Sequence, residues 1–96
     1  METQVLTKVD KYSLNGVGFT KREVLSSPDH IQLRADELKR GLTLGNLYKE
    51  STKMRFENAA GEPMETEGCI WAVTEQNVIL KNHIWIPITC IFEVIV

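Results

Sequence analysis

Histidine and cysteine are the side chains best able to do chemistry at neutral pH, and this sequence contains two of each: His30, His83, Cys69 and Cys90. A catalytic nucleophile needs a base within hydrogen-bond reach and a third group that orients the base. A zinc site usually needs about four ligands, often paired two to four residues apart. None of these residues has such neighbours in the sequence. We therefore expect no catalytic site, no metal and no cofactor, and we expect that the protein is not an enzyme.

The two cysteines lie within apolar, strand-like stretches, Cys69 beside Ile70 and Cys90 beside Ile91. A reactive thiol needs a partly exposed, electropositive setting, so core packing is the better explanation of both. The first four residues do not resemble a signal segment, and the longest apolar run is far shorter than the roughly 20 residues of a membrane helix. The sequence therefore predicts a cytoplasmic protein with buried free thiols and no membrane association.

Recognition by aromatic and cationic side chains is the second chemistry that the sequence could support. Trp85 alternates with Ile84 and Ile86, so its side chain should point away from whatever these two residues bury. Exposed tryptophan is enriched where partners dock, which makes Trp85 the best single candidate for an interface anchor. The ordinary alternatives stay open: Trp71 and Trp85 could be core residues, and a turn histidine is usually only solvated. The candidate partner or RNA surface is Tyr48, Arg55, Lys81, Asn82, His83 and Trp85.

The composition is that of one ordinary globular domain covering residues 1–96. Hydrophobic residues make up 43% of the chain and charged residues 25%, and the formal net charge is −2. A chain of this length can bury one core without disulfides. The eleven basic and thirteen acidic side chains are mixed along the sequence, so no single-sign field covers the molecule. Duplex DNA is therefore excluded as an expected partner.

One helix should position these residues from one side. The apolar residues Ile31, Ala35, Leu38 and Leu42 have helical spacing and predict a helix over residues 34–44. Gly41 should mark a close approach to a strand, and Gly45-Asn46 should end the helix in a left-handed turn. Upstream, Ser27-Pro28-Asp29 predicts a turn or a helix start.

Residues 1–30 are otherwise predicted to be a hairpin or an extension. Asn15-Gly16 is typical of a two-residue hairpin turn, so residues 9–14 should pair with residues 17–24. Residues 1–7 could equally be a loose tail.

The remainder of the chain predicts short strands joined by tight turns. Residues 53–57 alternate, with Met54 and Phe56 inward, and residues 58–61 form the next turn. The following strand should begin at about Glu65. Residues 69–74 read as a strand that is apolar on both faces and covered by the helix. Turns are expected at residues 75–77 and 81–83, where each stretch contains an asparagine able to adopt the left-handed conformation.

The end of the chain should turn a corner and then form the last strand. Pro87 cannot donate to a ladder, so residues 86–88 end a strand, residues 89–91 make one tight turn, and residues 92–96 form the final strand. That strand should pair back with the first one. Together these features predict a mainly β fold with one helix, in the form of a closed five-stranded barrel capped by the helix.

This order of helix, bent strands, proline corner and closing strand resembles the Sm-like and SH3-like small barrels. The segments at residues 42–48, 71–74, 78–81 and 86–88 are also similar to those of small bacterial proteins of unassigned activity. Sm-like proteins form rings and bind single-stranded RNA, which is what the resemblance implies here.

Two functions follow as expectations. The first is a non-catalytic interaction or assembly module that self-associates through a sheet edge, because residues 92–96 are apolar on both faces. The alternative is an Sm-like protein that binds single-stranded RNA or regulates through it.

Overall fold

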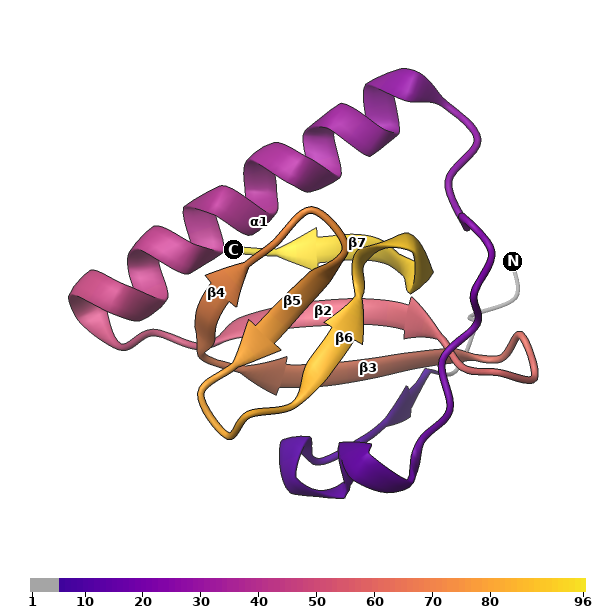
Figure 1. Cartoon of the computed structure of the whole chain (residues 1–96), viewed down its shortest axis with the longest axis horizontal. Helices are drawn as coiled ribbons and strands as arrows, with labels where there is room; N and C mark the ends of the chain where they lie inside the picture. Colours follow the sequence, from indigo (N-terminus) through magenta and orange to yellow (C-terminus); the bar gives the residue numbers. More distant parts are fainter. Residues whose placement is uncertain (1–5) are drawn as a thin grey trace.

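The longest element is helix α1 (Pro28–Tyr48), which lies along one side of the molecule (Figure 1). The structure is a computed structural model that describes residues 6–96, without the side chains of residues 11, 12 and 15. Pro28 occupies the first turn of α1, where its missing N–H is not needed, and Ser27 precedes it in an extended conformation. The expected helix is therefore confirmed, but it begins six residues earlier and ends four residues later than the apolar spacing indicates.

The expected stop at Gly45-Asn46 is wrong, because the left-handed residue that ends α1 is Lys49, with a φ of 57°. Gly45 stays helical and serves packing instead. A Cβ atom at Gly45 would lie 2.7 Å from the carbonyl oxygen of Ile70, so only glycine lets the helix rest on that backbone. At Gly41 a Cβ would lie 2.8 Å from Thr52 Oγ1, which confirms the expected close approach.

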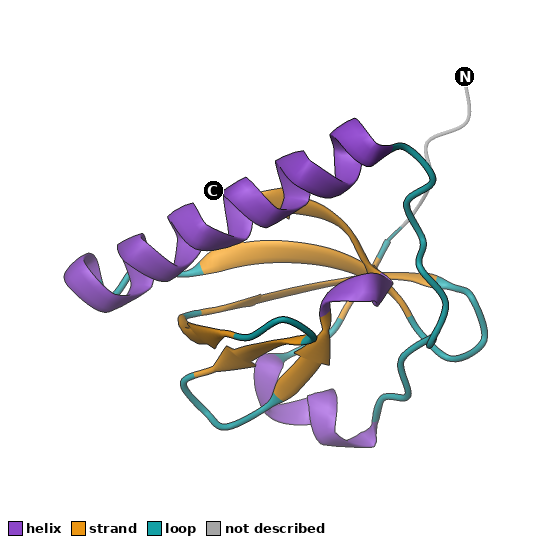
Figure 2. Ribbon diagram, turned by 45° about the horizontal axis from the view of Figure 1, so that its top comes forward, coloured by secondary structure: helices purple, strands orange, loops and turns teal. Residues whose placement is uncertain are grey.

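The strands form two sheets, and α1 lies on the same side of both (Figure 2). The first has the order β1-β3-β2-β7 and contains β1 (Thr7–Lys8), β2 (Thr52–Glu57), β3 (Pro63–Gly68) and β7 (Ile91–Ile95). The second has the order β4-β5-β6 and contains β4 (Ile70–Val73), β5 (Asn77–Leu80) and β6 (Trp85–Pro87). The described chain is therefore mainly β with one long helix.

The expectation of a closed barrel is wrong. The sheets are joined by the chain at two corners: Cys69 separates β3 from β4, and the 3-10 helix η2 (Ile88–Cys90) separates β6 from β7. No ladder of hydrogen bonds joins β6 to β7 among residues 6–96, so the strands form two separate sheets and do not close into a barrel. The predicted return of the last strand is confirmed, since β7 pairs antiparallel with β2.

The expected strands and turns are mostly confirmed. Met54 and Phe56 are fully buried, while β3 begins at Pro63, two residues before the expected start. In the turn after β5 the left-handed residue is His83, with a φ of 65°, rather than the expected asparagine. Within residues 6–96, no helix is both long enough and apolar enough to cross a membrane.

The predicted hairpin of residues 9–24 is wrong. Residues Lys11–Gly16 form the 3-10 helix η1, and the following segment contributes only one isolated bridge, between Phe19 and Asn58. Leu14, at 1% exposure, belongs to the core between the sheets, and this burial overrides the turn signal of the neighbouring residues. The chain around η1 therefore closes the core on the side away from α1, and the segment after it runs up to the start of the helix (Figures 1 and 2), where Glu23 pairs with Arg34 of α1 at 2.6 Å.

Candidate functional site

The three-stranded sheet has one buried face and one open face. Ile70, Val78 and Ile86 are fully buried on the inner side. On the outer side the register places Ala72 opposite Ile79 and Ile79 opposite Trp85. An apolar row therefore crosses the outer side of all three strands; its central residue, Ile79, is itself only 6% exposed, whereas Trp85 beside it is exposed.

A β-bulge adds a second tryptophan to this row. The register between β4 and β5 shifts between Ile70 and Ala72, so Trp71 has no residue directly opposite it. The exposed fraction is 52% for Trp71 and 57% for Trp85. Two tryptophans on one short sheet are thus both more than half exposed, although each carries a large apolar area that folding normally buries.

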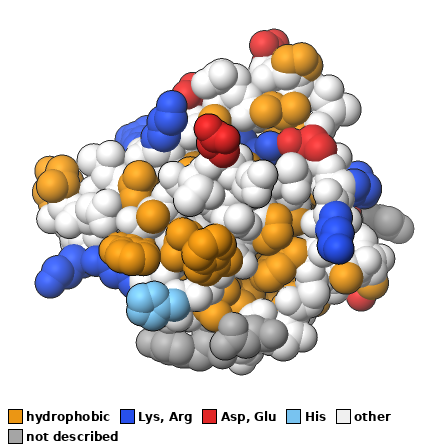
Figure 3. All heavy atoms as spheres, in the orientation of Figure 1, with side chains coloured by type: hydrophobic (Ala, Val, Ile, Leu, Met, Phe, Trp, Pro, Cys, Tyr) orange, Lys and Arg blue, Asp and Glu red, His pale blue; other side chains and the backbone are white. Residues whose placement is uncertain are grey.

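The hairpin that joins β5 to β6 carries His83 to the same face. Its backbone N–H donates to the carbonyl oxygen of Leu80 at 2.9 Å, which closes the turn. The imidazole ring meets the Trp71 ring edge-on, with ring centroids 5.8 Å apart and an interplanar angle of 81°. We call Trp71, Ile79, His83 and Trp85 the aromatic face. Figure 3 shows hydrophobic side chains gathered over these strands, next to a histidine.

The turn before β5 forms the other border of the aromatic face. The Thr74 hydroxyl accepts the N–H of Asn77 at 2.9 Å and that of Gln76 at 3.3 Å. A hollow of about 360 Å³ lies between this turn and Trp85. The ring of Trp85 is therefore accessible from its side as well as from above.

The structure brings together only part of the expected partner surface. Lys81, Asn82, His83 and Trp85 share one hairpin, and Trp85 points outward as predicted. Tyr48 is exposed at the last residue of α1, outside the three-stranded sheet.

Arg55 lies on the other sheet and is already engaged. Its side chain contacts Glu65 at 3.0 Å and Glu93 at 2.9 Å, and the hydrogen bond to Glu65 is the main cause that raises the pKa of the guanidinium. The register explains these pairs, because Glu65, Arg55 and Glu93 lie opposite one another on β3, β2 and β7.

Trp71 and Ile79 are the members of the aromatic face that sequence reasoning missed. The prediction of two covered faces is correct for Ile70, which lies under α1, but wrong for Trp71. Alternation alone could have placed Trp71 opposite Ile70. The β-bulge places Ala72 on the same side of the sheet as Trp71, and no pattern in the neighbouring residues predicts that bulge.

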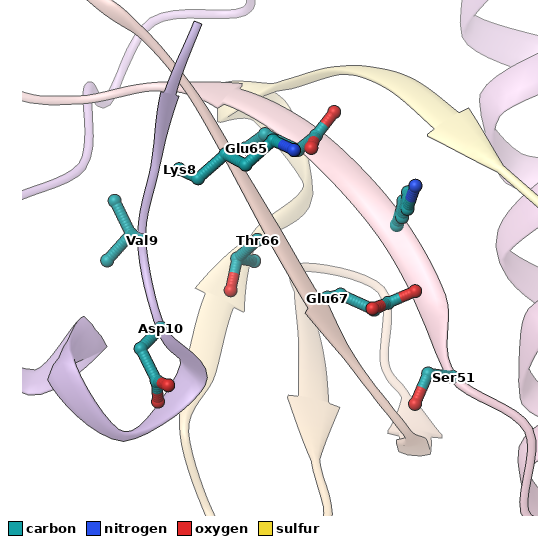
Figure 4. Close-up of a pocket in the computed structure, with 8 residues that line it drawn as sticks. Lys8, Val9, Asp10, Ser51, Glu65, Thr66 and Glu67 are labelled. Atoms are coloured by element: carbon teal, nitrogen blue, oxygen red, sulfur yellow. The ribbon is translucent and has the colours of Figure 1, made fainter.

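The larger polar hollow, on the four-stranded sheet, has mixed charge. Its volume is about 530 Å³, and Figure 4 shows Lys8, Val9 and Asp10 at one end and Ser51 and Glu67 at the other. Both acidic and basic side chains line it, and its Glu65 is bound by Arg55. Among residues 6–96 no three His, Cys, Asp or Glu side chains are grouped so that they could hold a metal ion.

The thiols and the remaining histidine show no catalytic arrangement. Cys90 is fully buried and its thiol donates to the carbonyl oxygen of Pro87; burial raises its pKa to about 12, so it stays protonated at neutral pH. Cys69 is only half-buried, contrary to expectation, and donates to the carbonyl oxygen of Glu50 at 3.3 Å. His30 is exposed in the first turn of α1.

Comparison with protein-family models, curated proteins and solved structures finds no match to this chain.

Proposed function

We propose that the protein is a non-catalytic interaction module of the cytoplasm that self-associates through the aromatic face. The observation that carries this proposal is the pair of tryptophans, Trp71 and Trp85, each more than half exposed on one side of the same short sheet. Tryptophan is enriched among the residues that dominate binding energy at protein interfaces. A second copy would remove both rings from water.

The charge pattern supports an interface at this place. Charged residues are depleted at the centre of protein interfaces and occur at the rim. Trp71, Ile79 and Trp85 lie on the strands, while Lys81 lies in one bordering turn and Glu75 in the other. Opposite charges at the two ends of the face would favour copies that meet in antiparallel orientation.

The strand order supports a finer proposal about the fold. If β3 and β4 are taken as one bent strand, a helix is followed by five strands, the last of which pairs with the first. We propose that this is an open relative of the Sm-like and SH3-like small barrels. Such folds host many functions, so this likeness adds nothing to the choice of ligand.

Tryptophan fluorescence tests the proposal directly, because the chain contains only two tryptophans and both lie on the aromatic face. Sedimentation of the whole chain over about 1–100 µM, the range in which weak association appears, should show a rising mass. The emission of both rings should shift to the blue over the same range.

Trp85→Ala should raise the dissociation constant by about tenfold or more, as expected for an interface anchor. Leu47→Ala, which truncates an exposed leucine on α1, is the control and should leave the constant unchanged. A monomer throughout the range would overturn the proposal, and so would an oligomer whose emission does not change.

Single-stranded RNA binding is the second candidate, because Lys81 and His83 are placed beside the tryptophan rings. Stacking of a base on an aromatic ring contributes roughly 1–3 kcal/mol. A labelled pool of RNA oligonucleotides should then quench the tryptophans, with an affinity that falls as salt rises. Absence of quenching at low salt would eliminate RNA as the ligand.

A further inference from the structure

We infer that the edge of β7 beside α1 binds an extended peptide with alternating apolar and basic residues, which adds a strand to the sheet. This site is on the four-stranded sheet, so it is independent of the aromatic face.

The other strand edges are short, covered or poor in donors. β1 contains only two residues, and β4 lies against α1, where Gly45 meets the backbone of Ile70. β6 has three residues and ends in Pro87, which lacks an N–H. β7 has five residues and, among residues 6–96, no strand on the side away from β2; α1 contacts it too, but less extensively than it contacts β4. It is the best open edge for strand addition.

Arg34 determines where along β7 the backbone becomes available to an added strand. The Arg34 guanidinium donates to the carbonyl oxygen of Ile91 at 2.9 Å, so the first residue of β7 is already partnered. Just before it, the N–H of Val24 donates to the carbonyl oxygen of Thr89. The open backbone therefore extends from Phe92 to Val96, which spans about 16 Å of strand.

A hollow of about 300 Å³ lies along the same edge, between β7 and the N-terminal half of α1. Its apolar lining comes from Leu25 and Leu33 on one side and from Phe92 and Val94 on the other. Leu33 is 54% exposed, although most other apolar side chains of α1 are at least half-buried. An added strand would find hydrogen-bond partners in β7 and an apolar wall for alternate side chains.

The charges around the hollow indicate which kind of peptide would bind there. Glu37 and Glu93 line it, and Glu93 shares the single cation of Arg55 with Glu65. Arg34 also lines it, but its charge is matched by Glu23 at 2.6 Å. The remaining titratable group is the His30 imidazole. The charge that is not paired within the protein is therefore negative, so basic residues of a peptide would be attracted to it. The β7 strand of a second copy would instead bring its own Glu93 against this acidic edge.

The test uses a labelled heptapeptide, acetyl-Lys-Val-Lys-Val-Lys-Val-Lys-amide, and fluorescence anisotropy with the whole chain at low salt. We expect saturable binding that weakens with salt. Two control peptides are expected not to bind: one has glutamate in place of lysine, and the other is N-methylated at alternate amides so that it cannot pair with a strand. Slower amide exchange at Phe92, Val94 and Val96 should accompany binding.

Matched variants locate the peptide on the chain. Leu33→Ala should weaken binding by about fivefold, because it removes much of the apolar wall, and Glu37→Lys should do so by a similar factor at low salt. Leu47→Ala truncates an exposed leucine at the other end of the same helix and should change the affinity less than about twofold. Trp85→Ala should bind the peptide as the wild type does.

Four results would overturn the inference. The first is no binding at about 1 mM peptide, where even weak strand addition should be detectable. The second is equal binding of the N-methylated peptide, and the third is an equal loss of affinity in Leu33→Ala and Leu47→Ala. The fourth is that Leu33→Ala abolishes self-association of the protein while the peptide does not compete with that association. The last result would assign the edge to a second copy. The first three results leave the aromatic face untouched, because its test is the fluorescence of Trp71 and Trp85. The fourth would also overturn self-association through the aromatic face, unless Trp85→Ala abolished association as well.

Discussion

At the scale of single residues, Arg34 is the most constrained charged side chain in the described part of the molecule. It is 5% exposed, binds Glu23 through two nitrogens at 2.6 and 2.7 Å, and donates a further hydrogen bond to Ile91. One guanidinium thus ties the segment before α1, the helix and β7 together. Loss of its partner would leave a buried charge without compensation, which is costly.

Glu23→Gln should therefore destabilise the protein in a pH-dependent way. The hydrogen bond from Arg34 is the main cause that lowers the pKa of Glu23 from its ordinary value of 4.5. The stabilisation from the carboxylate is therefore complete above pH 4.5 and is lost as the pH falls through the lowered pKa. At pH 7 we expect a loss of about 1–3 kcal/mol in urea unfolding.

As the pH falls through that range, the unfolding free energies of Glu23→Gln and the wild type should converge. Glu75→Gln, which changes an exposed carboxylate in a turn, should track the wild type throughout. A difference between Glu23→Gln and the wild type that stayed constant down to acid pH would rule out the ion pair as its source.

At the scale of elements, the contact between α1 and β4 determines how closely the helix packs. Gly45 lies against Ile70 backbone, which cannot move aside, whereas Gly41 faces the side chains of Thr52 and Ile70. The two glycines therefore tolerate a methyl group to different degrees.

Gly45→Ala should destabilise the protein by about 1–3 kcal/mol, because the clash outweighs the gain of about 1 kcal/mol in helix propensity. Gly41→Ala should cost less. Asn46→Ala, at the exposed neighbouring position, should be neutral or slightly stabilising. Urea unfolding measures all three, and equal stability of Gly45→Ala and Asn46→Ala would contradict the close contact.

At the scale of the whole molecule, the two sheets share one core that the N-terminal segment completes. Leu14 joins the core from η1, and Phe19 packs against Phe56 with ring centroids 5.3 Å apart. The segment is therefore part of the domain and not an appendage.

Leu14→Ala should destabilise the chain by about 2–5 kcal/mol, the range for a leucine removed from a packed core. The Leu47→Ala control should change the unfolding free energy by less than about 0.5 kcal/mol, because that side chain is exposed. Urea unfolding with one transition seen by fluorescence and by circular dichroism is the measurement. A small effect of Leu14→Ala would mean that the core is complete without η1.

The sequence by itself determined the elements whose signal is local. The helical spacing of Ile31, Ala35 and Leu38 located α1, and alternation located β2 with Met54 and Phe56 inward. Alternation also pointed Trp85 outward. These features depend on which side of a helix or strand a residue occupies, and neighbouring residues decide that.

Only the tertiary structure decided the features that join distant residues. Arg55 is a candidate partner residue by sequence, but in the fold it is paired with Glu65 and Glu93, which lie on either side of it. Trp71 joined Trp85 on one face through a bulge, and Leu14 was drawn into the core from a segment that reads as a hairpin turn. Register, bulges and core closure are set by contacts between segments far apart in the chain, so local pattern carries no signal for them.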